Sequence, residues 1–227
     1  MSLFNTVTVP CPVCGEQTEI SWAASVNADR RPDLREAILD RSFQSEPCPS
    51  CGTAVRLPPH LTYVDLARGN WIVANDVSEL PNWQAHEADA KALFDETFGA
   101  YAPDPAREMG EGFQPRLVFG WPALREKLLC ASLGLNDVDL ELLKMAVMRS
   151  VPGTPLGGGL TLRLLEGDAD TLKLGVTNDA TEAWTESIMV PRSAYDDIAG
   201  NTEAWAELRG QLANAALMDV TRFMVGE

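Results

Sequence analysis

The sequence contains the pattern Cys-Pro-x-Cys-Gly twice, as Cys11-Pro12-Val13-Cys14-Gly15 and as Cys48-Pro49-Ser50-Cys51-Gly52. In each copy two residues separate the thiols, and at this spacing a tight turn brings two sulfur atoms to one point. The glycine after the second cysteine supplies the positive-φ position of such a turn. Two such turns provide four thiolates, which form the closed tetrahedral ligand set of a structural Zn²⁺ site. We therefore predict that one structural zinc ion is bound by Cys11, Cys14, Cys48 and Cys51.

The residues around both motifs predict β-hairpins with the cysteines at their tips, because apolar and polar residues alternate there. These residues are 3–9 and 17–22 around the first motif, and 42–44 and 53–57 around the second. Two hairpins that clamp one metal form a zinc ribbon. The 33 residues between Cys14 and Cys48 exceed the usual separation of about 15–20. Residues 33–40 explain the excess, since they follow Pro32 and repeat apolar residues as a short amphipathic helix does.

Two other functions of the cysteine pairs are alternatives to zinc binding. CPxC is also the active-site form of glutaredoxin-like redox proteins, in which a low-pKa thiol lies at a helix N-terminus, but a strand pattern follows Cys14. Disulfide pairing is the second alternative, and a chain without a secretory signal is expected in a reducing compartment. The doubled spacing favours zinc over both. The fifth cysteine, Cys130, is predicted to be a small buried hydrophobe.

The composition is that of an acidic globular protein. Of the 227 residues 45% are hydrophobic and 22% are charged, which excludes wholesale disorder. The 18 basic and 33 acidic residues give a net charge of −15, which disfavours nucleic acid as a partner because most of the surface repels phosphates. The sequence also lacks a secretory signal and a run of about 18 apolar residues, so we expect a cytoplasmic protein without a membrane segment.

Together with further segments, the paired motifs identify a family resemblance. These segments are Ser25-Val26-Asn27, Pro32-Asp33-Leu34, Leu61-Thr62-Tyr63-Val64-Asp65, Trp121-Pro122-Ala123-Leu124-Arg125-Glu126-Lys127-Leu128 and Gly134-Leu135-Asn136-Asp137-Val138. Over about residues 1–150 the sequence resembles the CpXC-domain proteins of bacteria. The resemblance implies a cytoplasmic bacterial protein with four metal-binding cysteines, and it implies no particular activity.

The remaining patterns predict an α+β fold. Residues 61–65 and 71–75 form a hairpin that extends the ribbon's sheet, and a helix runs from Pro81 to about Phe98. Residues 101–115 contain three prolines and two glycines, which predicts a loop and hinge. A strand at 116–119 and two helices follow, the first from Pro122 to Gly134 and the second capped by Asn136 or Asp137.

The C-terminal part is predicted to be a small α+β unit. Residues 151–159 form a Gly/Pro linker, since the Lys-Ser/Thr of a P-loop is absent from this glycine-rich stretch. An antiparallel meander of strands 160–164, 171–177 and 183–190 follows, covered by a helix at 193–199 and a long helix that starts at Asn201 or Thr202. The predicted organisation is a CpXC-like domain at 1–150 (zinc ribbon 1–78, helical part 79–150), the linker 151–159 and the unit 160–227.

Catalytic motifs are lacking. His86-Glu87 does not continue to a histidine at position 90, and His60 is predicted to be a loop residue rather than a spare metal ligand. The sequence therefore predicts a non-enzymatic, zinc-stabilised interaction or adaptor protein that binds another protein. The alternative is nucleic-acid binding through the ribbon, which contains Arg30, Arg31, Arg35, Arg41 and Arg56. A third hypothesis is an enzyme whose site lies between the two parts, and one or two exposed tryptophans would mark a partner surface.

Overall fold

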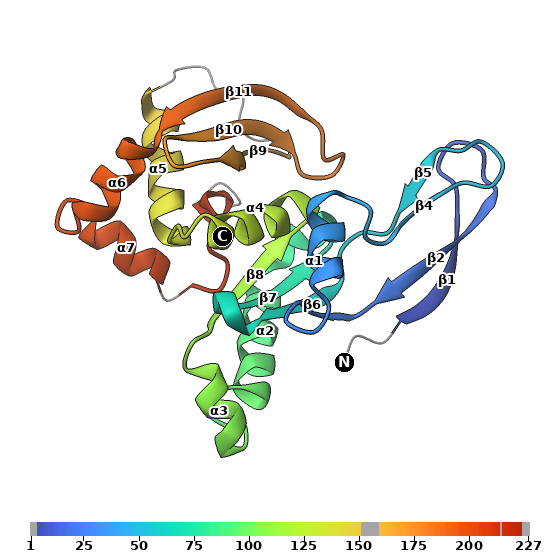
Figure 1. Ribbon diagram of the computed structural model, residues 1–227, viewed down its shortest axis with the longest axis horizontal. Coiled ribbons are helices and arrows are strands. Elements are labelled where there is room, and N and C mark those ends of the chain that lie inside the picture. Colours follow the sequence, from blue (N-terminus) through green and yellow to red (C-terminus); the bar gives the residue numbers. More distant parts are fainter. Residues whose placement is uncertain (1–3, 151–158, 214, 224–227) are drawn as a thin grey trace.

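The computed structural model describes residues 4–150, 159–213 and 215–223. The described chain is mixed α+β and comprises a ribbon of two hairpins, a central mixed sheet and a C-terminal antiparallel sheet (Figure 1). This confirms the predicted fold class. The described residues include no helix that is long and apolar enough to cross a membrane.

The ribbon consists of two antiparallel hairpins and projects from the rest of the molecule (Figure 1). Strand β1 (Phe4–Pro10) pairs with β2 (Gln17–Ala23), and β4 (Ser45–Pro47) pairs with β5 (Ala54–Arg56). A small cluster joins the hairpins, in which Ile20 and Val55 pack with Cys11 and Cys48. The two predicted hairpins are confirmed, but the first strand of the second hairpin is Ser45–Pro47 and not the predicted 42–44.

Helix α1 (Pro32–Leu39) is the predicted insertion between the hairpins. Proline at the first helical position is pre-organised for the helix, and Leu34 and Ile38 are buried on the inner side. Before it, β3 (Ser25–Asn27) leaves the ribbon and pairs in parallel with β6 (Leu61–Asp65).

The central sheet has the strand order β3-β6-β7-β8, with β7 (Asn70–Asn75) antiparallel to β6 and β8 (Gln114–Phe119) parallel to β7. The hairpin β6–β7 is thus confirmed, with the short 3₁₀ helix η1 (Leu66–Arg68) at its turn. The prediction that it extends the ribbon's sheet is wrong. The edge of β6 is occupied by β3, so this hairpin belongs to a separate sheet.

The segment between β7 and β8 is more helical than predicted. The 3₁₀ helix η2 (Val77–Asn82) contains Pro81, so the long helix α2 (Trp83–Thr97) begins two residues later. The predicted loop at 101–115 contains α3 (Asp104–Gly110). Its prolines are compatible with a helix because Pro103 and Pro105 lie at its N-terminus, where the missing N–H has no helical partner.

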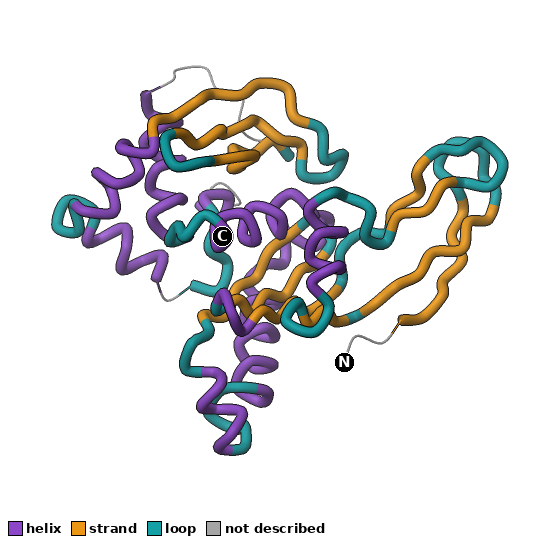
Figure 2. The backbone as a smooth tube through the Cα atoms, viewed as in Figure 1, coloured by secondary structure: helices purple, strands orange, loops and turns teal. Residues whose placement is uncertain are grey.

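Helix α4 (Trp121–Ser132) lies between the central sheet and the C-terminal sheet (Figure 2). The C-terminal sheet has the order β11-β10-β9 and contains β9 (Leu160–Gly167), β10 (Thr171–Asn178) and β11 (Trp184–Pro191). This is the predicted meander. Helices α5 (Asp137–Ser150), α6 (Arg192–Gly200) and α7 (Ala206–Ala213) lie beside it, and η3 (Val220–Phe223) follows.

The predicted long helix from Asn201 or Thr202 is reduced to α7. Beyond it the chain runs along β8, where the Leu117 N–H donates to the Ala216 carbonyl at 2.8 Å. The N–H groups of Ala216 and Leu217 donate to Glu87 Oε1 at 2.7 and 3.0 Å. These amides bond to a helix-α2 side chain and not to a preceding turn, so α7 does not continue.

One core includes residues from both sides of the predicted linker. Leu140 and Leu142 of α5 pack with Leu162 of β9 and Leu174 of β10. Residues 151–158 of the predicted linker lie outside the described residues, and the division of the chain into domains stays a prediction.

Candidate metal centre

The four predicted ligands lie together at the tips of the ribbon hairpins. Their sulfur atoms lie within 4.8 Å of one another. The Sγ atoms of Cys11 and Cys51 are 3.7 Å apart, and those of Cys14 and Cys48 are 3.5 Å apart. Zinc–sulfur bonds of about 2.3 Å in a tetrahedron place the sulfurs about 3.8 Å apart. The separations across the hairpins match this edge, so the cluster can hold a metal ion.

Both motifs fold into the same turn. The Gly15 N–H donates to the Cys11 carbonyl and the Gly52 N–H donates to the Cys48 carbonyl, each at 2.9 Å. The two glycines have φ values of +76° and +71°, which a residue with a Cβ adopts only with strain. The first cysteine of each pair is buried and the second is exposed. The sequence spacing therefore dictates where each sulfur lies.

Backbone and hydroxyl donors stabilise thiolates in the second motif. The N–H groups of Cys51 and then Ser50 lower the pKa of Cys48. The hydroxyl and then the N–H of Thr53 lower the pKa of Cys51 to about 6. The Glu16 N–H acts in the same direction on Cys14, but the neighbouring sulfurs raise the pKa of that thiol to about 12. Without a metal the Cys14 thiol thus keeps its proton at neutral pH, and a cation that binds all four thiolates would displace it.

The geometry does not support the alternatives for these cysteines. Bonded sulfurs in a disulfide are about 2.05 Å apart, and all five thiols are free. Each CxxC lies between two strands, where a redox CxxC would precede a helix. Cys130 is 1% exposed, and its Sγ lies 3.4 Å from the Leu135 carbonyl oxygen, as expected for a buried small side chain. His60 is exposed and lies outside the sulfur cluster.

A model of one protein family, described as "CpXC protein", matches residues 9–144. This range covers more than half of the chain and contains all four clustered cysteines. The chain belongs to the CpXC family. In this CpXC protein the match ends within α5, so β9, β10 and β11 lie beyond it. No curated protein and no solved structure matches the chain.

Most of the arginines considered for nucleic-acid binding are engaged within the chain. Arg31 pairs with Asp33 at 2.6 Å, and Arg56 pairs with Glu182 at 2.8 Å. Arg35 is 8% exposed and pairs with Glu36. Three of the five arginines therefore have a carboxylate partner, while Arg30 and Arg41 are exposed and have none among the described residues.

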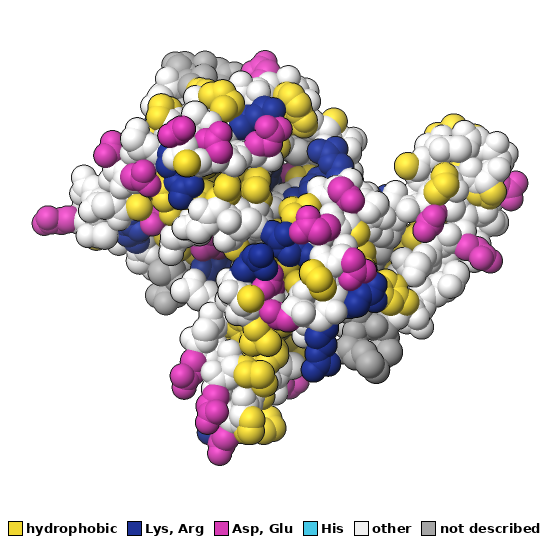
Figure 3. Space-filling view, viewed as in Figure 1, with side chains coloured by type: hydrophobic (Ala, Val, Ile, Leu, Met, Phe, Trp, Pro, Cys, Tyr) yellow, Lys and Arg dark blue, Asp and Glu magenta, His cyan; other side chains and the backbone are white. Residues whose placement is uncertain are grey.

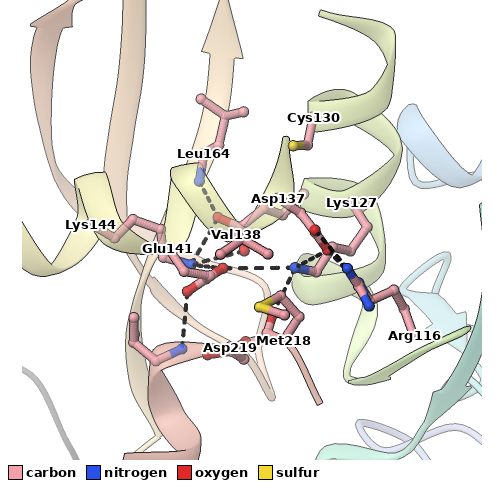
Figure 4. A network of polar contacts seen from close by, with 12 residues as sticks. Arg116, Lys127, Cys130, Asp137, Val138, Glu141, Lys144, Leu164, Met218 and Asp219 are labelled. Carbon is pink, nitrogen blue, oxygen red and sulfur yellow. Dashed lines mark hydrogen bonds and ion pairs between the residues drawn. The ribbon is translucent and has the colours of Figure 1, made fainter. Parts of the chain in front are cut away.

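The sequence analysis missed a buried ionic network between α4, α5 and β9 (Figure 4). Lys144 Nζ lies 2.9 Å from Glu141 Oε1 and 3.1 Å from Glu126 Oε2, and all three side chains are fully buried. Glu126 also accepts hydrogen bonds from Arg163 Nη1 at 3.0 Å and from the Leu164 N–H at 2.7 Å. The only sequence clue is the i, i+3 spacing of Glu141 and Lys144, which also occurs on exposed helix faces.

The network extends to Asp137 at the start of α5. Its carboxylate accepts bonds from Arg116 Nε at 2.6 Å and from Lys127 Nζ at 3.1 Å. Burial alone would raise the pKa of Asp137, but Lys127 and Arg116 hold it well below its usual range. Lys127 Nζ also donates to the Met218 carbonyl at 2.6 Å, and the Val220 N–H donates to Glu141 Oε2 at 3.0 Å. The network therefore fastens the C-terminal segment to α4 and α5.

Proposed function

We propose that the four cysteines bind one structural Zn²⁺ and that this CpXC protein is a non-enzymatic interaction module of the cytoplasm. The observation that supports zinc is the match between the sulfur separations of 3.5 and 3.7 Å and a tetrahedral thiolate edge of about 3.8 Å. Four protein ligands fill a tetrahedral zinc, so such a site has a structural role and keeps no open position for a substrate.

The proposed zinc would supply most of the folding free energy of the ribbon. The apolar cluster between the hairpins has four buried members, and two of them are Cys11 and Cys48. An isolated two-stranded hairpin is marginally stable in water. Metal binding at such a site is folding free energy, so the ribbon is expected to lose its structure without the metal.

A matched pair of buried cysteines tests the zinc assignment. In Cys48→Ser we expect loss of zinc and collapse of the backbone amide shifts of β1, β2, β4 and β5 toward unfolded values. In Cys130→Ser we expect one zinc per chain and an intact ribbon, because this thiol lies in the core that α5 forms with the C-terminal sheet. Elemental analysis and ¹H–¹⁵N spectra measure both. Retention of one zinc and of dispersed ribbon amides in Cys48→Ser would overturn the proposal.

The shape of the molecule supports a protein partner. The ribbon stands away from the body, and Val13 at its tip is 70% exposed, with further hydrophobic side chains along the same projection (Figure 3). The net charge of −15 disfavours a nucleic acid. A photocrosslinking amino acid in place of Val13 should give one discrete protein adduct that disappears after zinc removal. The same label in place of the exposed Glu207 is the control, and equal labelling from both positions would contradict the proposed role.

A further inference from the structure

A cavity of about 320 Å³ lies where the family region meets the C-terminal sheet. It is lined by Arg41 after α1 and Arg125 of α4. Glu182 in the turn between β10 and β11, and Trp184 at the start of β11, also line it. In the space-filling view, Lys and Arg side chains gather between the C-terminal sheet and the α1 region (Figure 3). The volume lies at the lower end of the range of about 300–1,000 Å³ for small-molecule sites.

The charges at this cavity do not balance. Glu182 is shared by two guanidiniums, with Arg56 Nη1 2.8 Å from both carboxylate oxygens and Arg125 Nη1 2.6 Å from Oε2. Arg41 adds a third guanidinium, and no described carboxylate lies within ion-pair distance of it. Two guanidiniums thus share one carboxylate, and a third lines the same cavity, in a chain whose net charge is −15.

The other charged groups nearby already have partners. Arg163 at the base of the cavity is bound by Asp179, Asp219 and Glu126. Glu166 at its rim pairs with Lys173 at 3.1 Å. The Asp40 carboxylate accepts hydrogen bonds from the hydroxyl and the N–H of Ser42, and its charge attracts Arg56. Among the arginines that line the cavity, Arg41 is therefore the one without a described carboxylate at ion-pair distance, and Arg125 shares its carboxylate with Arg56.

Arg56 retains donor capacity even after its ion pair forms. Its side chain is mostly buried, its guanidinium stacks 4.3 Å from the Trp121 ring centroid, and its Nη2 atom has no hydrogen-bond partner among the described residues. Burial lowers the pKa of Arg56 to about 10 against the attraction of Glu182, and repulsion from Arg125 and Arg41 acts in the same direction as burial. An oxyanion bound beside Arg41 and Arg125 in the cavity would relieve this repulsion.

Backbone strain is also concentrated at the cavity. Among the described residues, three that are not glycine have positive φ, and two of them, Arg41 at +71° and Glu182 at +61°, line this cavity. Such conformations are strained and cluster at ligand sites. The strain thus falls on the two residues that place the charges.

We propose that this cavity is a binding site for a small molecule that carries a phosphate or carboxylate group, held by the guanidiniums of Arg41 and Arg125, which line it. Guanidinium groups bind both oxyanions through paired N–H donors. Glu182 holds Arg56 and Arg125 in place and thereby pre-organises the site. This ligand site is separate from the cysteine cluster and does not depend on the identity of its metal.

Titration of the full zinc-loaded chain tests the proposal. Inorganic phosphate and acetate are added separately at constant ionic strength, and the arginine Nε–Hε signals are followed by NMR. We expect saturable shifts with a Kd of about 1 mM or tighter for phosphate if the ligand is a phosphate ester, and for acetate alone if it is a carboxylate. Saturation by neither anion would overturn the proposal.

The control variant separates a site from general screening. Arg41 is exposed, so Arg41→Met is expected to fold and to weaken anion binding at least tenfold. Arg30→Met removes the same charge from another exposed position and should leave the affinity unchanged. Equal weakening in both variants would show non-specific attraction and would refute the site.

Discussion

Lys144 provides the sharpest test of the buried network, because its ammonium group contacts two carboxylates and all three side chains are fully buried. In Lys144→Met the methionine fills a similar volume without the charge. Glu126 keeps Arg163 Nη1 and the Leu164 N–H as partners. Glu141 keeps the Val220 N–H, with Lys127 Nζ 3.8 Å away. The variant therefore leaves Glu141 buried without its closest cation, so this carboxyl group either stays charged at a cost or takes up a proton.

The expected loss of stability is about 3–5 kcal/mol at neutral pH, the range for removal of one partner of a buried ion pair. At about 2–4 °C per kcal/mol for a chain of this size, this lowers Tm by about 6–20 °C. Lys91→Met is the matched control, since Lys91 is 45% exposed and makes only a helix-surface pair with Glu87. It should change stability by less than about 0.5 kcal/mol.

The cost of Lys144→Met should also depend on pH. Burial raises the pKa of Glu141 from 4.5 to about 7 even with Lys144 opposing it, and loss of Lys144 raises it further. A group whose folded pKa is raised loses its stabilising contribution as pH rises through that pKa. The difference in the free energy of unfolding between the native protein and Lys144→Met should therefore widen above pH 7, by up to about 1.4 kcal/mol per pH unit.

Urea unfolding at pH 5.5, 7 and 8.5, followed by circular dichroism at equal zinc, measures this difference. A loss of stability below about 1 kcal/mol at pH 7, or a loss that is the same at all three pH values, would refute the description of Lys144 and Glu141 as a buried ion pair.

Three further changes have defined outcomes. Asp137→Asn should lower the free energy of unfolding by about 3 kcal/mol at pH 7. Because Lys127 and Arg116 depress the pKa of Asp137, the native protein should lose this extra stability as pH falls through and below 3.8. Parallel Tm curves of the two proteins between pH 7 and 3 would contradict this prediction. Gly110→Ala places a Cβ 2.1 Å from the Phe98 carbonyl oxygen and should lower stability by about 1–3 kcal/mol. In the control Gly112→Ala the new Cβ meets nothing within 4 Å, so this variant should be tolerated. The same Tm for both variants would show that Gly110 of α3 does not pack against Phe98. Glu87→Ala removes the acceptor of the Ala216 and Leu217 amides, so both amides should exchange with solvent faster, and unchanged exchange would show that another group holds this segment.

Local sequence patterns predicted the cysteine cluster well because its geometry is encoded locally. Each CxxCG turn is closed by its own backbone hydrogen bonds and by a glycine with positive φ. Alternating strands and the proline at the start of α1 are equally local features. Only the contact between the two turns joins residues far apart in the sequence. It is predictable because a tetrahedral zinc site needs four thiolates and each turn supplies two.

Features that depend on distant partners could not be predicted in the same way. Nothing near Ala216 in the sequence shows that its N–H binds Glu87 from α2 and not a preceding helical turn. The charges of Glu126 and Lys144 resemble those of solvated helix faces, and they are buried only because β9 and its Arg163 pack over them. Likewise, β3 determines the sheet to which β6 belongs.

Zinc content combined with thiol protection tests the central claim most directly. Cys130 lies buried outside the ribbon and resists alkylation with or without metal. Cys11 and Cys48 are buried while the ribbon is folded, whereas Cys14 and Cys51 are exposed even then. Their reaction with iodoacetamide therefore reports on the metal. We predict about one zinc per chain, with Cys14 and Cys51 unmodified in the native protein and modified after chelation. A chain without zinc in which Cys14 and Cys51 react at once would contradict the metal centre.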